Sequence, residues 1–164
     1  MDDAAARVVG ARLAELYARI WAGPMRDVPI CNEALGVEAV GFRAYGDAAI
    51  GIVVTPWFMN LVVVDASGQA SQIRSGAVVS VKLPAGEVDC VGGWLDDFGP
   101  LRSCSLFSPM FEFSDMAFAR DVAVEAMTAF FTQPAQEEAP RDSVGLDRRA
   151  LLGGRLSREK EARP

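Results

Sequence analysis

The sequence predicts an α+β fold in a single domain, built mainly on an antiparallel sheet with an N-terminal helix and a C-terminal helix packed on it. Apolar residues recur at helical spacing near the start of the chain and again near residue 120. Between these two segments lie several short strand-like runs separated by turn residues. This periodicity ends near residue 133, so we expect a domain over residues 1–133 and a flexible charged tail over residues 134–164.

The first element is an amphipathic helix predicted over residues 4–22. Its large apolar residues recur at steps of three and four positions and therefore share one helix face: Val9, Leu13, Leu16, Tyr17 and Ile20. Gly23 and Pro24 follow, and both residue types disfavour continuation of a helix. The spacing predicts a helix that ends before Gly23 and buries one face.

Short apolar runs in the middle of the chain are typical of strands: residues 37–42, 50–64, 78–83, 87–94 and 101–107. The second run is free of charge, but Pro56 and Asn60 interrupt it. We therefore expect two strands joined near the proline, and no membrane span. The connections between runs are too short for helical crossovers, which predicts antiparallel pairing.

A second helix is predicted after Ser114 or Asp115, because either side chain can accept a hydrogen bond from the first helical turn. Its apolar face would cover one side of the sheet and comprises Ala119, Val122, Ala123, Ala126, Met127 and Phe130. We expect this helix to end before Pro134.

Composition narrows the class of function. The chain has 164 residues, no histidine, and three cysteines without a C-x-x-C pair. Histidine-based catalysis and metal binding are therefore excluded, and we expect no metal site and no cofactor. A net charge of −6 disfavours nucleic acid as a partner, because its phosphates would be repelled. The acidic Met1-Asp2-Asp3, with no secretory signal after it, predicts a cytoplasmic protein.

Two proline-containing stretches, residues 55–60 and 104–113, are rich in large apolar residues. Pro109 takes the second stretch out of strand geometry, so the apolar residues after it lie on irregular backbone. Such residues either fill the end of the core or line a groove for a peptide, to which methionine and aromatic surfaces are suited. If they line a groove, the partner-binding residues are Trp57, Phe58, Met59, Asn60, Cys104, Leu106, Phe107, Met110, Phe111, Glu112 and Phe113.

Four motifs follow one another in a distinctive order: V-E-A-V-G-F at 37–42, T-P-W-F-M-N-L at 55–61, L-P-x-G at 83–86 and C-S-L-F-S-P-M-F-E-F at 104–113. Through these motifs the chain resembles the HybE/HupJ family of [NiFe]-hydrogenase assembly chaperones over about residues 29–131. The resemblance implies a protein that is not an enzyme. It implies an accessory chaperone that binds the small-subunit precursor of an uptake hydrogenase until cofactor insertion is complete.

The contact implied by the resemblance is with the precursor's twin-arginine leader, its folded part, or both. The large subunit and other maturation proteins are further partners that the resemblance allows. Residues 1–133 carry 16 acidic and 9 basic side chains, a net charge of −7, whereas residues 134–164 carry 6 acidic and 7 basic. An acidic domain with an apolar groove would complement a leader that combines two arginines with an apolar stretch.

Two alternatives remain open at the level of sequence. Cys104, on the same strand face as Arg102, is the candidate nucleophile of a thiol-dependent enzyme, although a buried structural role is typical of Cys104 and of Cys90. Cys31 lies in an irregular stretch and is expected to be more exposed. In the second alternative, the groove holds an apolar small ligand, and the chain is a binding module or a structural subunit of a maturation complex.

The tail contains the run D-R-R-A-L-L-G at residues 147–153, which looks like a twin-arginine motif. Arg148, Arg149 and Leu151 occupy its key positions, but charged residues follow where a leader has an apolar run. The pair of arginines is therefore either accidental or part of a pseudo-leader. A pseudo-leader would compete with the partner for the acidic domain at the high effective concentration of a tethered segment.

If the pseudo-leader competes, deletion of the chain after Ala139 should tighten the binding of a twin-arginine leader peptide. The paired substitution Arg148→Ala and Arg149→Ala should do the same with the tail in place. Titration calorimetry on the three chains measures this. Equal affinity for the full-length, truncated and doubly substituted chains would show that the arginine pair is accidental.

Overall fold

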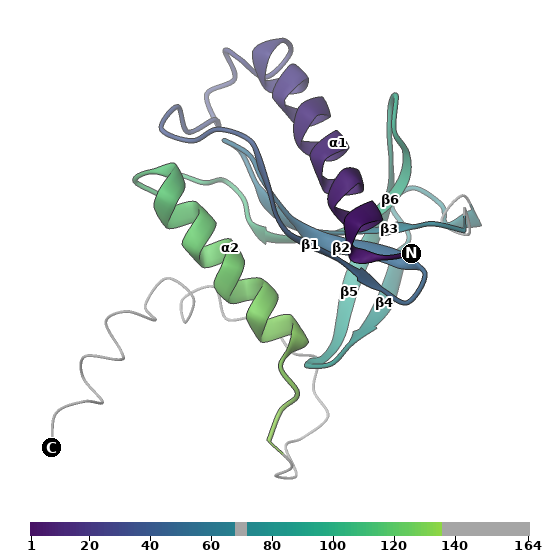
Figure 1. Ribbon diagram of the computed structural model, residues 1–164. Coiled ribbons are helices and arrows are strands. Elements are labelled where there is room, and N and C mark those ends of the chain that lie inside the picture. Colours follow the sequence, from purple (N-terminus) through teal and green to yellow (C-terminus); the bar gives the residue numbers. More distant parts are fainter. Residues whose placement is uncertain (68–71, 136–164) are drawn as a thin grey trace, which may run out of the picture.

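The computed structural model describes residues 1–67 and 72–135 (Figure 1). They form a single α+β domain, as predicted, with two helices and six strands: α1 (Asp3–Ala22), β1 (Glu38–Tyr45), β2 (Ala48–Val54), β3 (Met59–Asp65), β4 (Val78–Leu83), β5 (Gly86–Leu95), β6 (Gly99–Phe107) and α2 (Met116–Phe131). Residues 136–164 of the predicted tail, including Arg148, Arg149 and Leu151, lie outside the described residues, so the boundary at residue 133 stays a prediction.

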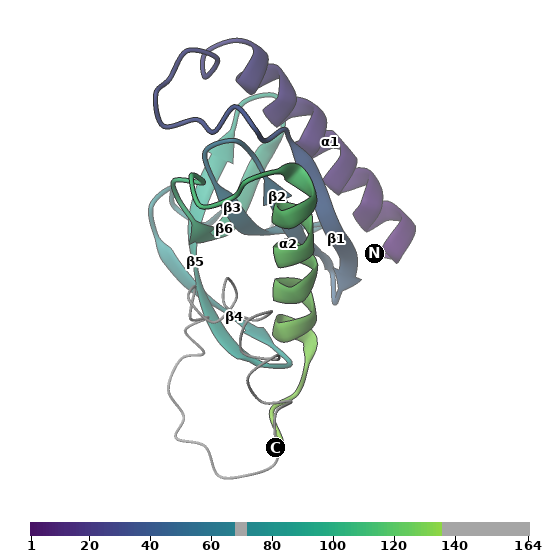
Figure 2. The same ribbon diagram turned by 90° about the vertical axis from the view of Figure 1, so that its left-hand side faces the viewer.

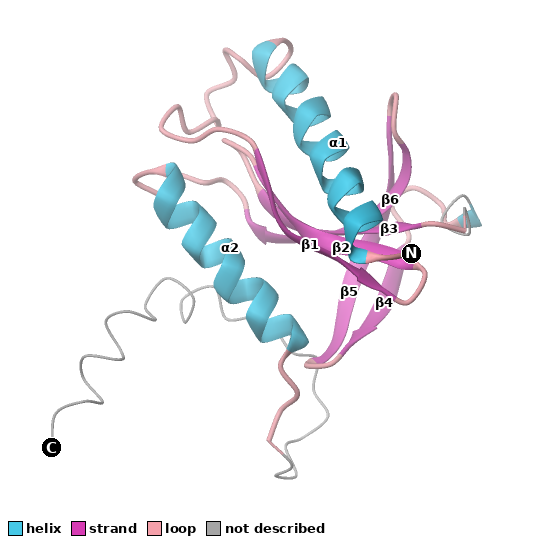
Figure 3. Ribbon diagram, in the orientation of Figure 1, coloured by secondary structure: helices cyan, strands magenta, loops and turns pink. Residues whose placement is uncertain are grey.

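The six strands form one antiparallel sheet in the order β1-β2-β3-β6-β5-β4, which confirms the predicted pairing mode (Figure 3). The uncharged run divides into β2 and β3, as its proline predicts. The first strand runs three residues beyond its predicted end, because Arg43, Ala44 and Tyr45 pair with the start of β2. The β4–β5 hairpin is placed beyond β6, so β3 and β6 become neighbours in the middle of the sheet.

The two helices cover opposite faces of the sheet (Figure 2). Successive side chains of β2 point to opposite faces: Ala49 and Val53 join the core beneath α1, while Ile50 and Ile52 join the core beneath α2. All seven residues of β2 are consequently buried. A strand covered on both sides must be apolar throughout, and this explains its uncharged sequence.

Each helix begins at an aspartate that accepts a backbone hydrogen bond. Asp2 accepts from the Ala5 amide at 2.8 Å, and Asp115 accepts from the Phe118 amide at 2.8 Å. Asp115, rather than Ser114, is therefore the cap of the second helix. No helix in the described part of the chain has the length and apolarity needed to cross a membrane.

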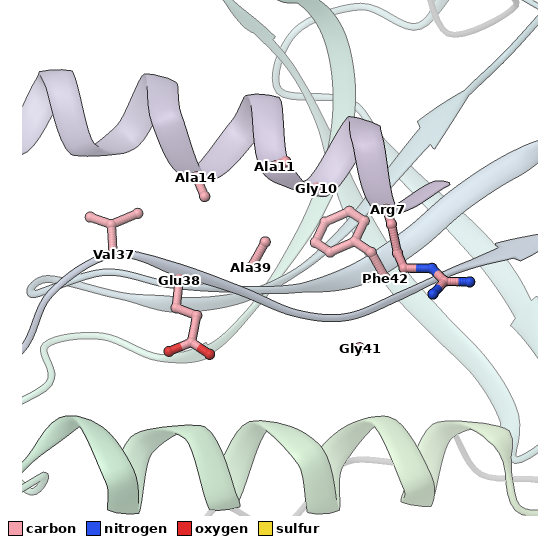
Figure 4. A pocket seen from close by; sticks show the side chains of 9 residues that line it. All are labelled: Arg7, Gly10, Ala11, Ala14, Val37, Glu38, Ala39, Gly41 and Phe42. Atoms are coloured by element: carbon pink, nitrogen blue, oxygen red, sulfur yellow. The ribbon is translucent and has the colours of Figure 1, made fainter. Parts of the chain in front are cut away.

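A bulge in β1 fixes α1 against the sheet. The register shifts between Val40 and Arg43, and Gly41 adopts a φ of 66°, a conformation that favours glycine. The extra residue turns Phe42 to the α1 side, where its ring points toward Gly10 of the helix (Figure 4). A Cβ at Gly10 would lie 2.6 Å from the Phe42 ring, and a Cβ at Gly51 of β2 would lie 2.2 Å from it. The ring thus occupies space that two glycines leave vacant.

Gly51→Ala should lower the free energy of unfolding by about 1–3 kcal/mol, because the added methyl group must displace the Phe42 ring from a close-packed site. Urea denaturation measures the change. Gly93→Ala is the matched control, since Gly93 also lies in a strand and a Cβ there would meet nothing within 4 Å. A Gly51→Ala protein as stable as the Gly93→Ala protein would contradict this account of the packing.

Candidate functional site

The two apolar stretches singled out in the sequence meet at one end of the sheet. Met59, at the start of β3, pairs with Phe107 at the end of β6. The turns beyond them also touch, because the Ser108 hydroxyl donates to the Trp57 carbonyl oxygen at 3.4 Å. Residues about 50 positions apart in sequence therefore form one surface, next to the C-terminal end of α1.

The β2–β3 turn is built around Thr55, which is fully buried. Its Oγ1 accepts hydrogen bonds from the Trp57 amide at 3.2 Å and the Phe58 amide at 2.9 Å, and its own hydroxyl donates to the Phe58 carbonyl oxygen at 3.1 Å. The Thr55 amide also donates to that carbonyl, at 2.8 Å. This network fixes the backbone that presents the Trp57 and Phe58 rings toward α1.

The turn's aromatic rings pack against two aromatic residues on the last turns of α1. Tyr17 lies edge-on to Phe58, with 5.3 Å between ring centroids, and Trp21 lies 6.3 Å from Trp57. Burial raises the pKa of the Tyr17 hydroxyl above its ordinary value. The sequence analysis did not predict Trp21 as part of this surface. The available signal was its position on the helix, one residue after Ile20 of the predicted apolar face.

Asn32 joins the two stretches, and sequence reasoning missed it. Its backbone amide donates to the Pro56 carbonyl oxygen at 2.8 Å. Its side-chain Nδ2 donates to the carbonyl oxygens of Met110 and Phe113 at 2.9 and 2.8 Å. One side chain therefore satisfies two carbonyl groups of the irregular segment after β6 and ties that segment to the β2–β3 turn.

Asn32→Ala should lower the free energy of unfolding by about 2 kcal/mol, because it leaves two partly buried carbonyl groups without their donor. Urea denaturation of the variant measures the loss. Glu33→Ala, at the neighbouring exposed position, is the control and should leave stability almost unchanged. Equal stability of the two variants would mean that the Asn32 amide does not hold the segment.

Burial divides the predicted partner-binding residues into two groups. Five of them lie in the core, with at most 4% of their surface exposed: Met59, Leu106, Phe107, Met110 and Phe113. Phe111 is 57% exposed and Glu112 is exposed, while the rest are half-buried: Trp57, Phe58, Asn60 and Cys104. The stretch after β6 thus fills the end of the core with Met110 and Phe113 and presents Phe111 and Glu112 outward.

The exposed members border a shallow hollow of about 270 Å³, lined by Phe107, Ser108, Pro109, Phe111 and Glu112. Its apolar wall comes from Pro109 and the two phenylalanines, and its one charged group is the Glu112 carboxylate. A hollow of this composition suits an apolar side chain accompanied by a positive charge. Asn60 and Cys104 lie within β3 and β6 and do not line it.

Two of the three thiols, Cys31 and Cys90, are buried, and Cys104 is half-buried. Burial is the main cause that raises the pKa of the Cys90 thiol to about 11, and the nearby Cys104 raises it further. Arg102, the expected activator of Cys104, donates instead to Asp65 at 2.6 Å. The expectation that Cys31 is more exposed is wrong: it is 8% exposed, and its thiol donates to the Met25 carbonyl oxygen at 3.4 Å.

These features define the class as a small α+β protein whose candidate site is a binding surface. Residues 8–154 match the family described as [NiFe]-hydrogenase assembly chaperone, HybE, and the chain belongs to that family. It is 45% identical over 162 residues to the hydrogenase expression/formation protein HupJ of Bradyrhizobium diazoefficiens, covering 96% of this chain and 95% of the relative. It is 36% identical to protein HoxT of Cupriavidus necator, covering 92% of this chain and 90% of that protein.

The fold has a counterpart among solved structures. The solution structure of HybE from Escherichia coli superposes with a TM-score of 0.58 at 18% identity, covering 83% of this chain and 88% of that one. This likeness confirms the α+β fold. Family membership confirms the resemblance found in the four motifs, makes the chain a hydrogenase-maturation chaperone and supports a role other than catalysis.

Proposed function

We propose that this chaperone binds the small-subunit precursor of an uptake hydrogenase in the cytoplasm and retains it until cofactor insertion is complete. The chaperone contacts the twin-arginine leader of the precursor, its folded part, or both, and the leader is the part that the described surface suits. The observation that carries the proposal is the hollow beside Phe111 and Glu112, which places a carboxylate at the edge of an apolar surface. A leader offers the complementary combination of arginine charge and apolar side chains.

The surroundings of the hollow support a peptide rather than a small ligand. The hollow is open and shallow, and the half-buried Trp57 backbone is joined to it through Ser108. Phe111 is 57% exposed on a segment whose neighbours Met110 and Phe113 are anchored by Asn32. A rigidly held exposed aromatic side chain loses little conformational entropy when a partner covers it, which favours affinity for a polypeptide.

A twin-arginine leader peptide should bind one equivalent of the full chain, with an affinity that falls as salt increases because part of the attraction joins exposed charges. Titration calorimetry measures this, with a peptide carrying two glutamines in place of the arginines as the comparison. Equal binding of the two peptides would show that the chaperone contacts the folded part of the precursor rather than the arginines of the leader.

Phe111→Ala should weaken leader binding about tenfold or more, in the range of a binding hot spot, without lowering the melting temperature. Trp94→Ala is the matched control, since Trp94 is 64% exposed on β5 and pairs with Pro100, at the opposite end of β6 from Phe107. Glu112→Gln should reduce the preference for arginines over glutamines, and Cys104→Ser should change binding less than Phe111→Ala does. Equal losses in Phe111→Ala and Trp94→Ala would reject the hollow as the site.

Trp57→Ala and Met110→Ala should also weaken binding, but through different routes. Met110 is fully buried, so its truncation lowers stability by about 2–5 kcal/mol, and the binding loss should follow the fraction unfolded. Trp57 is half-buried between the turn and α1, so its truncation removes packing against Trp21 and also removes the proposed contact with the partner. Thermal melts recorded with each titration separate the two effects.

A further inference from the structure

Strand β1 lies at one edge of the sheet, in a slot between the two helices. It pairs with β2 on one side only. A hollow of about 430 Å³ lies between β1 and α1, and a second hollow of about 360 Å³ lies between β1 and α2. Gly41 lines both, so the two hollows flank the same short piece of edge strand.

The floor of the α1 hollow is made of small residues. Gly10, Ala11 and Ala14 face the slot from the helix, and Ala39 and Gly41 face it from β1 (Figure 4). Small side chains allow another backbone to approach β1 closely, which a strand added to the sheet requires. The slot is therefore open to a polypeptide main chain as well as to side chains.

One end of the β1 edge is already occupied. The Ala44 amide donates to Oδ1 of Asp3 at 2.8 Å, which shows that this amide points away from β2. Outward and inward groups alternate along an antiparallel strand, and the register around the bulge turns the Ala39 amide outward in the same way. The edge available to an added strand consequently covers only the piece from Glu38 to Gly41, enough for four to six residues of a partner.

Charges of both signs border the slot, but its two carboxylates are engaged: Asp3 accepts from the Ala44 amide, and Glu38 pairs with Arg120. Glu38 is neutralised by Arg120, whose guanidinium binds both carboxylate oxygens at 2.8 to 3.0 Å. Arg7 borders the α1 hollow and Arg43 borders the α2 hollow, and neither forms an ion pair with any residue in the described ranges 1–67 and 72–135. The Arg7 Nε donates to the Asp3 carbonyl oxygen at 3.2 Å, and the Arg43 guanidinium lies 4.3 Å from the centroid of the Phe131 ring, so each guanidinium keeps its charge available to a carboxylate.

We propose that the β1 edge binds a short extended segment of a partner protein that carries two adjacent acidic residues. Adjacent side chains of an added strand point to opposite faces, so one carboxylate reaches Arg7 and the next reaches Arg43. The main chain of the segment bonds to the outward backbone groups of β1. This surface is distinct from the hollow at Glu112, and the proposal does not rest on leader binding, because a basic leader is repelled by these arginines.

The test uses the ¹⁵N-labelled full chain and capped hexapeptides followed by amide chemical shifts. The probe has the sequence Thr-Val-Glu-Glu-Val-Thr, with a Lys-Lys version and a version N-methylated at alternate residues as comparisons. The glutamate peptide should shift the amides of residues 38–43. The lysine peptide should fail because of charge repulsion, and the N-methylated peptide should fail because methyl groups replace the amide hydrogens along one edge of the extended peptide.

The doubly substituted chain Arg7→Glu with Arg43→Glu should bind the glutamate peptide about tenfold more weakly or not at all. Arg74→Glu, an exposed arginine outside the slot, should bind it as the unsubstituted chain does. Both arginines of the slot are exposed, so the variant should keep its amide spectrum outside residues 1–12 and 37–45. Equal binding of the lysine peptide, shifts confined to β4, or no shift at millimolar peptide would overturn the proposal.

Discussion

The packing of one phenylalanine between two glycines organises the domain. Phe42 occupies the space that Gly10 and Gly51 leave free, so α1 is held close to β1 and β2. The bulge at Gly41 makes this contact possible, because it turns Phe42 to the α1 face while Val40 stays with the α2 core. Because this contact fixes α1 against the sheet, the last turns of the helix reach the β2–β3 turn, and Tyr17 packs against the ring of Phe58. The candidate site therefore depends on a contact about two turns earlier in the helix, at Gly10.

Local sequence patterns were sufficient for the elements of this fold and insufficient for their arrangement. Helical periodicity located α1 and α2, and turn residues with short connections predicted antiparallel strands, because both signals act between residues close in the chain. The pairing of β3 with β6 joins strands separated by the whole β4–β5 hairpin, and no local pattern encodes it. The same limit applies to the glycine pocket, whose three residues come from α1, β1 and β2. Periodicity reports which face is apolar and not which partner will cover it.

In the candidate site, local sequence patterns did not predict which apolar residues are exposed or which distant groups Asn32 contacts. The aromatic stretches of the site were recognised, but the neighbours Met110 and Phe111 have opposite environments, at 0% and 57% exposed. On a strand, alternation would have separated them, whereas the irregular backbone after Pro109 offers no period to follow. The clamp by Asn32 was equally inaccessible, since its acceptors lie 78 and 81 residues away. An asparagine in a polar-looking loop indicates a local turn in most sequences, and only the structure shows that its amide reaches across the domain.

The two surfaces proposed as binding sites differ in charge. The hollow at the end of the sheet carries the carboxylate of Glu112, while the β1 edge carries the guanidinium groups of Arg7 and Arg43. The net charge of −6 therefore does not describe every part of the surface, because Arg7 and Arg43 form no ion pair with the described residues. If both surfaces bind a client as proposed, their opposite charges fix its orientation, since a reversed client would face repulsion at both sites. If both are occupied by one polypeptide, the second contact forms at the effective concentration set by the first, and two modest affinities yield a slowly dissociating complex. In that case, folding of the client that removes one of the two segments from reach would promote release and couple dissociation to completion of assembly.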